Sequence, residues 1–363
     1  MSNGNQRVVI VGIGAVAEAI AQSARALPEA TLVAGSCRTK QKGEAFAAKH
    51  ACNWYADTDE MLAKEKPDVA VIASPTGTHL EGLLACCRHN VNVLCEKPLE
   101  INMPRVQRMI SAARDAGIIL GGIFPQRFNA PVRAIFDAAR AGRFGRLSVI
   151  TVAVPWWRED SYYAGSWHGT REIDGGGALI NQGSHSVDLL QWIAGATMPE
   201  LSREENPVEE VFSFTARRAH DEKILESEDT CVATLRFRNG ALGQIVSCTS
   251  MYPGTHRRLI VSGRDGLAEL VEDQIQKWVF RQEKPEDAGV REKFGASTKH
   301  AGGSSNPMAF DYTNHQRNLE AFLLAVRERR EPQLSAREAA KAVGIIQACY
   351  ESARIGKAVR VAT

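Results

Sequence analysis

Three polar side chains in one segment could act on a hydroxyl group. Residues 174–188 read DGGGALINQGSHSVD, and the stretch after the glycines predicts a helix. Asn181, His185 and Asp188 are spaced i, i+4 and i+7, so they share one face of that helix. His185 could take a proton from a hydroxyl as its carbon loses hydride. Two other interpretations stay open, a structural histidine and a metal site made by His185 and Asp188, although we expect no metal.

Lys97 is the second candidate for chemistry. It follows the apolar strand expected at 91–95, in the sequence Cys95-Glu96-Lys97-Pro98. In a doubly wound sheet, ligands bind at the carboxyl ends of the strands, which places Lys97 beside a bound ligand. Its ammonium could polarise a sugar carbonyl or hydroxyl and stabilise developing alkoxide charge. The alternative is an ordinary surface ion pair with Glu96. Pro98 fixes the turn, and a cis bond is one way to do so.

A dinucleotide fingerprint lies near the start of the chain. Residues 12–17, GIGAVA, fit G-x-G-x-x-A between a strand at 7–12 and a helix at 15–26. The first glycine permits the tight turn, the second lets the backbone approach the pyrophosphate, and the helix N-terminus faces the phosphate charge. The residues expected to contact the cofactor here are Gly12, Ile13, Gly14, Ala15 and Val16. The alternative is a glycine turn in a Rossmann-like protein that binds no dinucleotide.

The end of the second strand bears on the choice of cofactor. Residues 35–40 read GSCRTK and contain no Asp or Glu for the adenosine ribose hydroxyls. Ser36 and Arg38 instead offer a hydrogen bond and positive charge to a 2′-phosphate. The sequence therefore favours NADP. The alternative is that Arg38 stacks on adenine and the enzyme accepts NAD.

Other loops are expected to border the same cofactor. Residues 73–79, ASPTGTH, follow the next strand, and their backbone and hydroxyls could line the ribose and pyrophosphate, or could cap the following helix. Gln126 and Arg127 follow the last strand of the first half and could lie where cofactor meets substrate. The further expected cofactor contacts are Ser74, Pro75, Thr76, His79, Glu96, Lys97 and Gln126.

Aromatic residues gather immediately before the glycine run. Trp156, Trp157, Tyr162, Tyr163 and Trp167 fall within about a dozen residues. Aromatic faces suit the apolar face of a pyranose, while Arg158, His168 and Arg171 could bind hydroxyls or a carboxylate. The alternative, expected for about half of the aromatics, is packing in the core or a subunit contact. The expected substrate contacts are Lys97, Arg127, Arg158, Tyr163, Trp167, Asn181 and His185.

The elements that must position these residues change character along the chain. Up to about Phe124, short apolar strands alternate with helices, which predicts an α/β fold with a Rossmann, doubly wound parallel sheet. Afterwards, strands at 147–154, 230–237, 241–248, 258–262 and 267–271 follow one another on short turns, which favours an α+β domain with a largely antiparallel sheet. We therefore expect a dinucleotide-binding domain at 1–125 and a substrate-binding domain at 126–363. An exposed loop is expected at 281–307 and closing helices at 314–330 and 336–355.

Composition excludes several classes of partner. The 363 residues carry 44 Lys and Arg against 42 Asp and Glu, a balance that gives no reason to expect nucleic acid or an anionic membrane. No apolar run approaches a membrane span, and the polar start, residues 1–7, does not resemble a signal peptide. The eight cysteines are scattered without a C-x-x-C pair, which indicates free thiols in a cytoplasmic protein.

Together, the GIG turn at 12–14, Glu96-Lys97-Pro98 and the segment 175–188 resemble the Gfo/Idh/MocA oxidoreductases. The resemblance covers about residues 7–361. It implies a Rossmann domain followed by an α/β domain whose open sheet supports the substrate site and usually the oligomer contact, hence a homo-oligomer, dimer or tetramer. It also implies hydride transfer between NAD(P) and a hydroxyl or carbonyl carbon of a sugar or polyol.

The usual catalytic group of that family is a Lys, an Asp and a His. Lys97 and His185 match two of them, but the Asp position holds Asn181. An amide cannot accept a proton, so Asn181 can only orient substrate or nicotinamide, and the proton must pass to His185 or Lys97. Asn181 followed by Gln182 is similar to the branch that oxidises position 3 of nucleotide-linked amino-sugar uronates. Two alternatives remain, a redox-assisted glycosidase or eliminase and a dinucleotide sensor without turnover.

Overall fold

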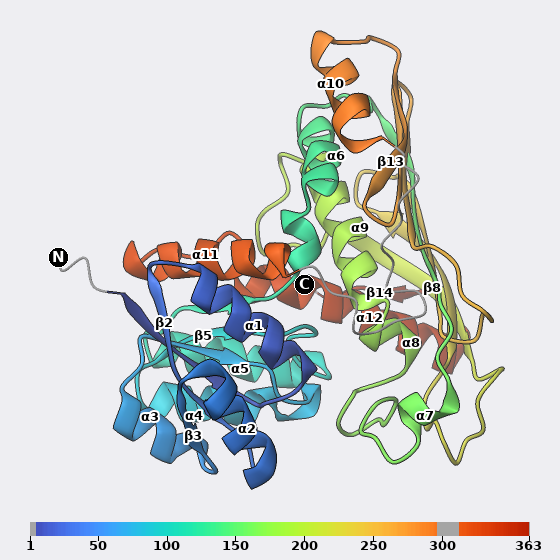
Figure 1. Cartoon of the computed structure of the whole chain (residues 1–363). Coiled ribbons are helices and arrows are strands. Elements are labelled where there is room, and N and C mark those ends of the chain that lie inside the picture. Colours follow the sequence, from blue (N-terminus) through green and yellow to red (C-terminus); the bar gives the residue numbers. More distant parts are fainter. Residues whose placement is uncertain (1–4, 296–311, 363) are drawn as a thin grey trace. The chain divides into compact units, whose positions relative to one another are not determined.

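The structure is a computed structural model that describes residues 5–295 and 312–362 (Figure 1). The chain forms two compact units. The first comprises residues 1–125 and 310–340, and the second comprises 126–309 and 341–363. The expected second domain, 126–363, therefore contributes residues 310–340 to the first unit. The physical reason is that helix α11 (Thr313–Arg327) packs on α1 (Ala15–Ala26) and buries Leu319, Phe322 and Leu323 in the core of the first unit.

The first unit is built on a six-stranded sheet in which every neighbouring pair is parallel. Its strands run in the order β3-β2-β1-β4-β5-β6, the Rossmann order. Strand β4 is buried along its whole length, as expected for a parallel strand covered on both faces. The strands are β1 (Gln6–Val11), β2 (Ala30–Ser36), β3 (Asn53–Tyr55), β4 (Val69–Ile72), β5 (Asn92–Cys95) and β6 (Leu120–Gly122).

Helices connect these strands. Helix α1 packs on α11, whereas α4 packs on both α3 and α5. Helix α3 begins after Asp57, whose carboxylate caps it by accepting the Glu60 N–H at 2.8 Å. The remaining connecting helices are α2 (Lys40–His50), α3 (Thr58–Glu65), the short η1 (Thr76–Thr78), α4 (His79–Arg88) and α5 (Met103–Asp115).

The second unit is built on an eight-stranded sheet in the order β13-β12-β11-β7-β10-β9-β8-β14. Only the pair β7–β10 is parallel, and the other pairs are antiparallel. The largely antiparallel sheet expected from the sequence is thus confirmed. Its strands are β7 (Leu147–Pro155), β8 (Val208–Ala216), β9 (Thr230–Phe237), β10 (Leu242–Cys248), β11 (Arg258–Gly263), β12 (Gly266–Val271), β13 (Gln274–Phe280) and β14 (Val359–Arg360).

Helices cover one face of this sheet and leave the other open. On the covered face, Ile150, Val152 and Ala233 are buried. On the open face, Phe214 is paired with Val232, and both are exposed, Phe214 by 65%. The helices of this unit are η2 (Pro125–Phe128), α6 (Ala130–Arg140), α7 (Asp160–Tyr163), α8 (Ala178–Asn181), α9 (Ser184–Ala196), α10 (Pro285–Phe294) and α12 (Ala336–Ile355), which begins in the first unit.

Two sequence-based expectations need correction. The exposed loop expected at 281–307 contains helix α10, which begins at Pro285 and whose Asp287 side chain accepts the Lys284 N–H at 2.7 Å. The remainder of that loop, from residue 296 on, lies outside the described residues. The single helix expected after the glycine run is two helices, α8 and α9, separated at Gln182 and Gly183.

Three further findings concern membrane spans, metal sites and cysteines in the residues that the structure describes. Within them, no helix combines the length and apolar character that crossing a bilayer requires. Within the same residues, no group of three or more His, Cys, Asp or Glu side chains is placed to bind a metal ion. All eight cysteines are free thiols.

Candidate active site

The glycine turn between β1 and α1 has the form that a phosphate-binding turn requires. Gly12 has a φ of +96°, and a Cβ at this position would lie 2.5 Å from Ser74 Cα, so only glycine fits. Gly14 precedes α1, is exposed, and a Cβ there would meet no atom within 4 Å. No side chain caps α1, so the N–H groups of its first turn are available to an anion.

The two residues expected to bind a 2′-phosphate differ in accessibility. The Ser36 side chain is buried, and its Oγ lies 3.0 Å from Thr58 Oγ1 at the start of α3. The expectation that Ser36 faces the cofactor is therefore not supported, because its hydroxyl is engaged inside the unit. Arg38, two residues on, is exposed.

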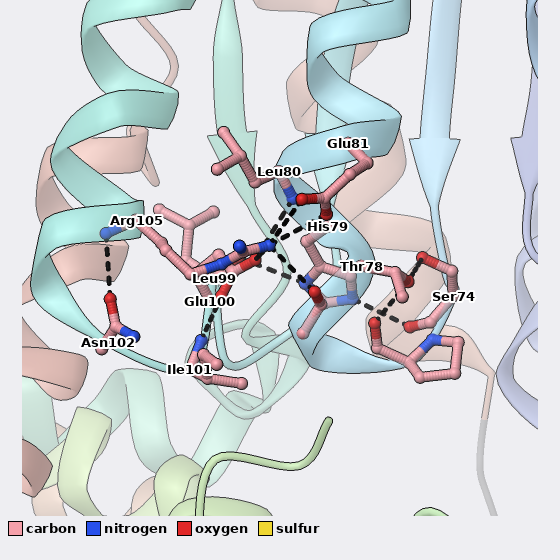
Figure 2. Close-up of polar contacts among 12 residues, drawn as sticks. Ser74, Thr78, His79, Leu80, Glu81, Leu99, Glu100, Ile101, Asn102 and Arg105 are labelled. Atoms are coloured by element: carbon pink, nitrogen blue, oxygen red, sulfur yellow. Dashed lines mark hydrogen bonds and ion pairs between the residues drawn. The ribbon is translucent and has the colours of Figure 1, made fainter. Parts of the chain in front are cut away.

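The loop after β4 is tied to the loop after β5 by His79 (Figure 2). Its Nε2 lies 2.9 Å from the Ser74 carbonyl oxygen and its Nδ1 lies 3.2 Å from the Leu99 carbonyl oxygen. The ring is buried, which lowers the pKa of His79. His79 was expected to border the cofactor, but both ring nitrogens face backbone carbonyls, so its role is to hold two loops together. Thr78 adds a hydrogen bond from its Oγ1 to Ser74 Oγ at 2.8 Å.

A buried carboxylate fixes the second of these loops. Glu100 accepts hydrogen bonds from the N–H groups of Ile101 at 2.6 Å and Leu80 at 3.3 Å, and an Arg105 Nη2 lies 2.8 Å from its Oε1 (Figure 2). Arg105 also donates to the Gly77 carbonyl at 2.9 Å. The segment that follows Lys97 is thus held to the start of α4 by charge-assisted hydrogen bonds.

Lys97 itself stands directly after β5, at the carboxyl edge of the parallel sheet, and is half-buried. The Lys97–Pro98 peptide bond is cis. The Glu96 carboxylate accepts the Lys97 N–H at 3.1 Å, and its other oxygen lies 3.9 Å from His315 Nε2 in α11. Burial raises the pKa of Glu96 to about 7, against the charge of Lys97. Glu96 was expected to contact the cofactor, but its carboxylate is buried and its contacts are with the backbone and α11.

In the second unit, Asn181 and His185 stand on either side of the break between α8 and α9. Asn181 ends α8, and the half-buried His185 is the second residue of α9. Gly183 stands at the break, and a Cβ there would lie 2.6 Å from both the Leu179 carbonyl oxygen and Ser247 Oγ, so only glycine fits. The one continuous helix that the sequence predicted is therefore interrupted between Asn181 and His185.

Asp188 and Arg127 form a buried ion pair. Arg127 Nε and Nη2 lie 2.7 and 2.6 Å from the two carboxylate oxygens of Asp188, and both side chains are almost fully buried. The guanidinium also lies 4.9 Å from the Trp192 ring centroid. Arg127 was expected to bind substrate and Asp188 was a possible metal ligand. Their mutual bidentate pairing instead attaches η2 to α9.

Glu228 and Tyr350 hold the start of α8. The Glu228 carboxylate accepts the N–H groups of Gly177 at 3.0 Å and Leu179 at 2.9 Å, and the Tyr350 hydroxyl at 3.0 Å. A Cβ at Gly177 would collide with the Glu228 carbonyl, which explains the last glycine of the run. Burial raises the pKa of Glu228 to about 7. The sequence gave no signal for either residue, since both lie far from the motif along the chain.

The aromatic segment divides into buried and accessible members. Tyr163 is 3% exposed and donates its hydroxyl to Thr249 Oγ1 at 2.8 Å, so it is a core residue rather than the expected sugar contact. Arg158 is also buried, with its guanidinium 5.1 Å from the Trp156 ring and 5.7 Å from the Tyr162 ring, and burial lowers its pKa. Trp167 is half-buried and stacks on His168, with ring centroids 4.1 Å apart.

Gln126 has a partner within the second unit. Its side-chain oxygen accepts a hydrogen bond from Arg257 Nη2 at 3.2 Å.

The structure thus brings Gly12 and Ser74 together in the first unit, and Asn181 and the aromatic segment in the second. The expected pairing of Lys97 with His185 joins residues of different units and stays a prediction.

Comparisons with known proteins agree with this geometry. Residues 6–123 match the family described as "Oxidoreductase family, NAD-binding Rossmann fold", and residues 138–361 match "Oxidoreductase family, C-terminal alpha/beta domain". The chain belongs to the Gfo/Idh/MocA oxidoreductase family. The resemblance of the three motifs is therefore confirmed.

Individual members give the range of likeness. A myo-inositol 2-dehydrogenase of Thermotoga maritima is 29% identical over 72% of this chain and 73% of its own length. A D-glucoside 3-dehydrogenase of Escherichia coli is 25% identical over 67% of this chain and 70% of its own length. The crystal structure of the WlbA dehydrogenase from Bordetella pertussis, in complex with NADH and UDP-GlcNAcA, is 28% identical, covers 100% of this chain and 99% of its own, and has a TM-score of 0.87.

As a Gfo/Idh/MocA oxidoreductase, the chain is an NAD(P)-dependent enzyme of the dehydrogenase and reductase class. The glycine turn fits the dinucleotide, because Gly12 is wedged against Ser74 while Gly14 and the first turn of α1 remain accessible. When bound, the nicotinamide accepts or supplies hydride. The relatives are named as dehydrogenases and reductases, which does not support the glycosidase or the sensor that the sequence left open.

Proposed function

We propose that the protein oxidises a hydroxyl-bearing ring carbon of a sugar, or reduces the matching carbonyl, with His185 as general base and Lys97 stabilising the alkoxide-like oxygen. The observation that carries the proposal is the position of Lys97. It follows β5 at the carboxyl edge of the sheet whose β1–α1 turn fits the dinucleotide. Asn181 would orient the substrate. Turnover of a panel of free and nucleotide-linked sugars with NAD(P) tests the proposal, and absence of turnover on every sugar and polyol would contradict it.

A nucleotide-linked amino-sugar uronate is the substrate we would test first. Two observations support it: Asn181-Gln182 in the catalytic segment, and the full-length similarity to the Bordetella pertussis enzyme with bound UDP-GlcNAcA. Free inositol and glucosides are the matched alternatives, since relatives with those names cover about 70% of this chain. The substrate with the highest kcat/KM decides between them.

The cofactor prediction concerns Arg38. We propose a preference for NADP, supported by the exposed Arg38 and by the absence of an acidic side chain at residues 35–40. Arg38→Ala should weaken NADP binding by roughly tenfold or more and NAD binding much less, because only NADP offers a 2′-phosphate for a charge-assisted hydrogen bond. Titration calorimetry with both dinucleotides measures this. Tighter binding of NAD than of NADP by the unaltered protein would refute the preference.

The substrate-site prediction now concerns Trp167. Its half-buried ring could stack on a pyranose, whereas Tyr163 is a core residue. Trp167→Ala should raise the sugar KM or lower kcat by roughly fivefold, through loss of about 1 kcal/mol of stacking contact, with dinucleotide affinity unchanged. Tyr163→Phe is the matched control and should reduce stability but not sugar KM. A Trp167→Ala variant with unaltered sugar kinetics would show that the segment is structural.

We also propose that the protein is a homo-oligomer, a dimer or a tetramer, assembled through the open face of the eight-stranded sheet. Apolar side chains occupy this face at Val149, Phe214, Val232 and Leu242, and all four are exposed in the single chain. Phe214→Asp should therefore shift the mass in solution towards the monomer, as measured by light scattering, while Lys64→Asp on the exposed surface of α3 in the first unit should not. A protein that is already monomeric would contradict the proposal.

The proposed location is the cytoplasm. All eight cysteines are free, and Cys86, Cys95, Cys231, Cys248 and Cys349 are buried thiols. Free thiols are typical of reducing compartments. Cell fractionation with an antibody against the protein tests this, and recovery in an extracytoplasmic fraction would contradict it.

A further inference from the structure

Asp174 is a buried carboxylate with a specific set of donors. It stands at the head of the glycine run and is 1% exposed. Asn181 Nδ2 lies 3.0 Å from its Oδ1 and 2.8 Å from its Oδ2, and the Gly169 N–H donates to the same Oδ2 at 2.8 Å. Asp174 therefore joins the aromatic segment to the end of α8, within the second unit.

The chemistry of this contact fixes which way the Asn181 amide faces. An ionised carboxylate can only accept hydrogen bonds, so the amide atom that faces Asp174 must be the nitrogen. The carbonyl oxygen of Asn181 lies in the same amide plane and points away from Asp174. Asn181 would offer an acceptor rather than a donor on that side.

We propose that Asp174 is a positioning residue, which orients the Asn181 amide so that its carbonyl oxygen accepts a hydrogen bond from a substrate hydroxyl. The inference rests on the proposed function, since it assigns Asn181 to the substrate. It deepens that function by naming what is selected at this point: a hydroxyl donor on the sugar. A substrate with an ether or a hydrogen in place of that hydroxyl could not donate this hydrogen bond and would bind less well.

Neighbouring residues support a fixed position for the carboxylate. Gly169, with a φ of +73°, brings its N–H to Asp174. Tyr162 lies close enough that the charge of Asp174 adds to burial in raising the pKa of its hydroxyl. That hydroxyl accepts a hydrogen bond from Gln182, the residue after Asn181, at 3.3 Å. The Asp174 carboxylate is thus held by the Gly169 N–H, and the residue after Asn181 contacts Tyr162.

An exchange of the two side chains tests the proposal. Asp174→Asn removes the charge that orients Asn181, and kcat should fall roughly tenfold. Asn181→Asp places two carboxyl groups in contact. The two groups then share one proton, and the pKa at which that proton is lost is raised. Its kcat relative to the unaltered protein should therefore fall as the pH rises and the second proton leaves. The double variant D174N/N181D restores one amide facing one carboxylate, and it should recover kcat to within about threefold, with no added pH dependence.

Two further variants separate positioning from a general structural role. In an Asn181→Ala background, Asp174→Asn should change kcat less than about twofold, because the side chain through which Asp174 acts is gone. Glu226→Gln is the matched charge control. Glu226 is exposed and accepts the Arg171 N–H at 3.1 Å in the same segment, and its removal should change neither kcat nor the pH profile.

The outcomes distinguish this inference from the function on which it rests. If Lys97→Ala and His185→Ala retain normal turnover, the proposed function fails. If those variants lose turnover but Asn181→Asp keeps the pH profile of the unaltered protein, or the double variant is no better than the product of the single ones, the role of Asp174 fails. Dinucleotide affinity and the thermal midpoint, measured for every variant, show whether each one is folded.

Discussion

His185→Ala should lower kcat by roughly 10²- to 10⁴-fold while dinucleotide affinity stays unchanged, because a positioned general base is lost and the first unit is untouched. His185 is half-buried at the second residue of α9, next to the break that ends α8. Lys97→Ala should show a loss of similar size, since the ammonium that stabilises the alkoxide-like oxygen is removed. Steady-state kinetics of sugar oxidation, with dinucleotide binding measured in parallel, gives the result.

The pH profile adds a second readout for His185. In the unaltered protein, sugar oxidation should rise with pH as the imidazole loses its proton, and His185→Ala should lose this dependence. His89→Ala is the matched control. His89 follows α4 at the opposite edge of the sheet from Lys97 and faces Asp59 at 3.1 Å, so its replacement should leave kcat unchanged. Near-normal turnover of His185→Ala would remove it from the mechanism.

Arg127→Ala should cost about 3–5 kcal/mol of the free energy of unfolding, the largest stability effect we expect from a single substitution. The reason is that the carboxylate of Asp188, which is fully buried, would lose its bidentate partner and remain charged in the interior. Contact with the Trp192 ring would be lost as well. Urea unfolding, followed by circular dichroism, measures the change.

A paired replacement separates loss of the ion pair from loss of packing. Arg127→Met with Asp188→Leu removes both charges, and it should be considerably more stable than Arg127→Ala, because no unpaired charge remains. Arg354→Ala is the control, since Arg354 pairs with Glu351 on the exposed surface of α12 and should leave the unfolding midpoint unchanged. A cost no greater for Arg127→Ala than for Arg354→Ala would mean that the buried pair does not stabilise the protein.

The elements of the first unit could be predicted because local signals were strong. The apolar run ending at Val11, the GIG turn and the alanine-rich helix at 15–26 carry their structure in adjacent residues, and helix α1 has the predicted bounds. Strand β3, at Asn53–Tyr55, was not predicted, since three half-exposed residues at a sheet edge show no periodicity. In the second unit, strand β8 was not predicted either, although it pairs along its length with β9.

The site was harder to predict because its supports come from distant residues. The pattern of Asn181 and His185 was visible, but Gly183 between them lies where a Cβ would collide with Ser247 in β10, a residue far along the chain. Arg127 and Tyr163 have side chains suited to a sugar, and only their burial shows that they pack inside the unit. Glu228 and Tyr350 reach α8 from elsewhere in the chain, so no spacing within the motif could reveal them.

The order in which the chain builds its first unit has a consequence for biosynthesis. Residues 1–125 supply the whole six-stranded sheet, but Leu319, Phe322 and Leu323 of α11 complete the core over Ile10, Val71 and Leu94. During translation that apolar surface therefore stays exposed until residues 126–309 and then helix α11 have been synthesised. A fragment that ends at residue 125 would expose the same surface and aggregate. We therefore expect that the dinucleotide-binding unit can be expressed alone only from a gene in which the codons for residues 310–340 are joined to those for residues 1–125.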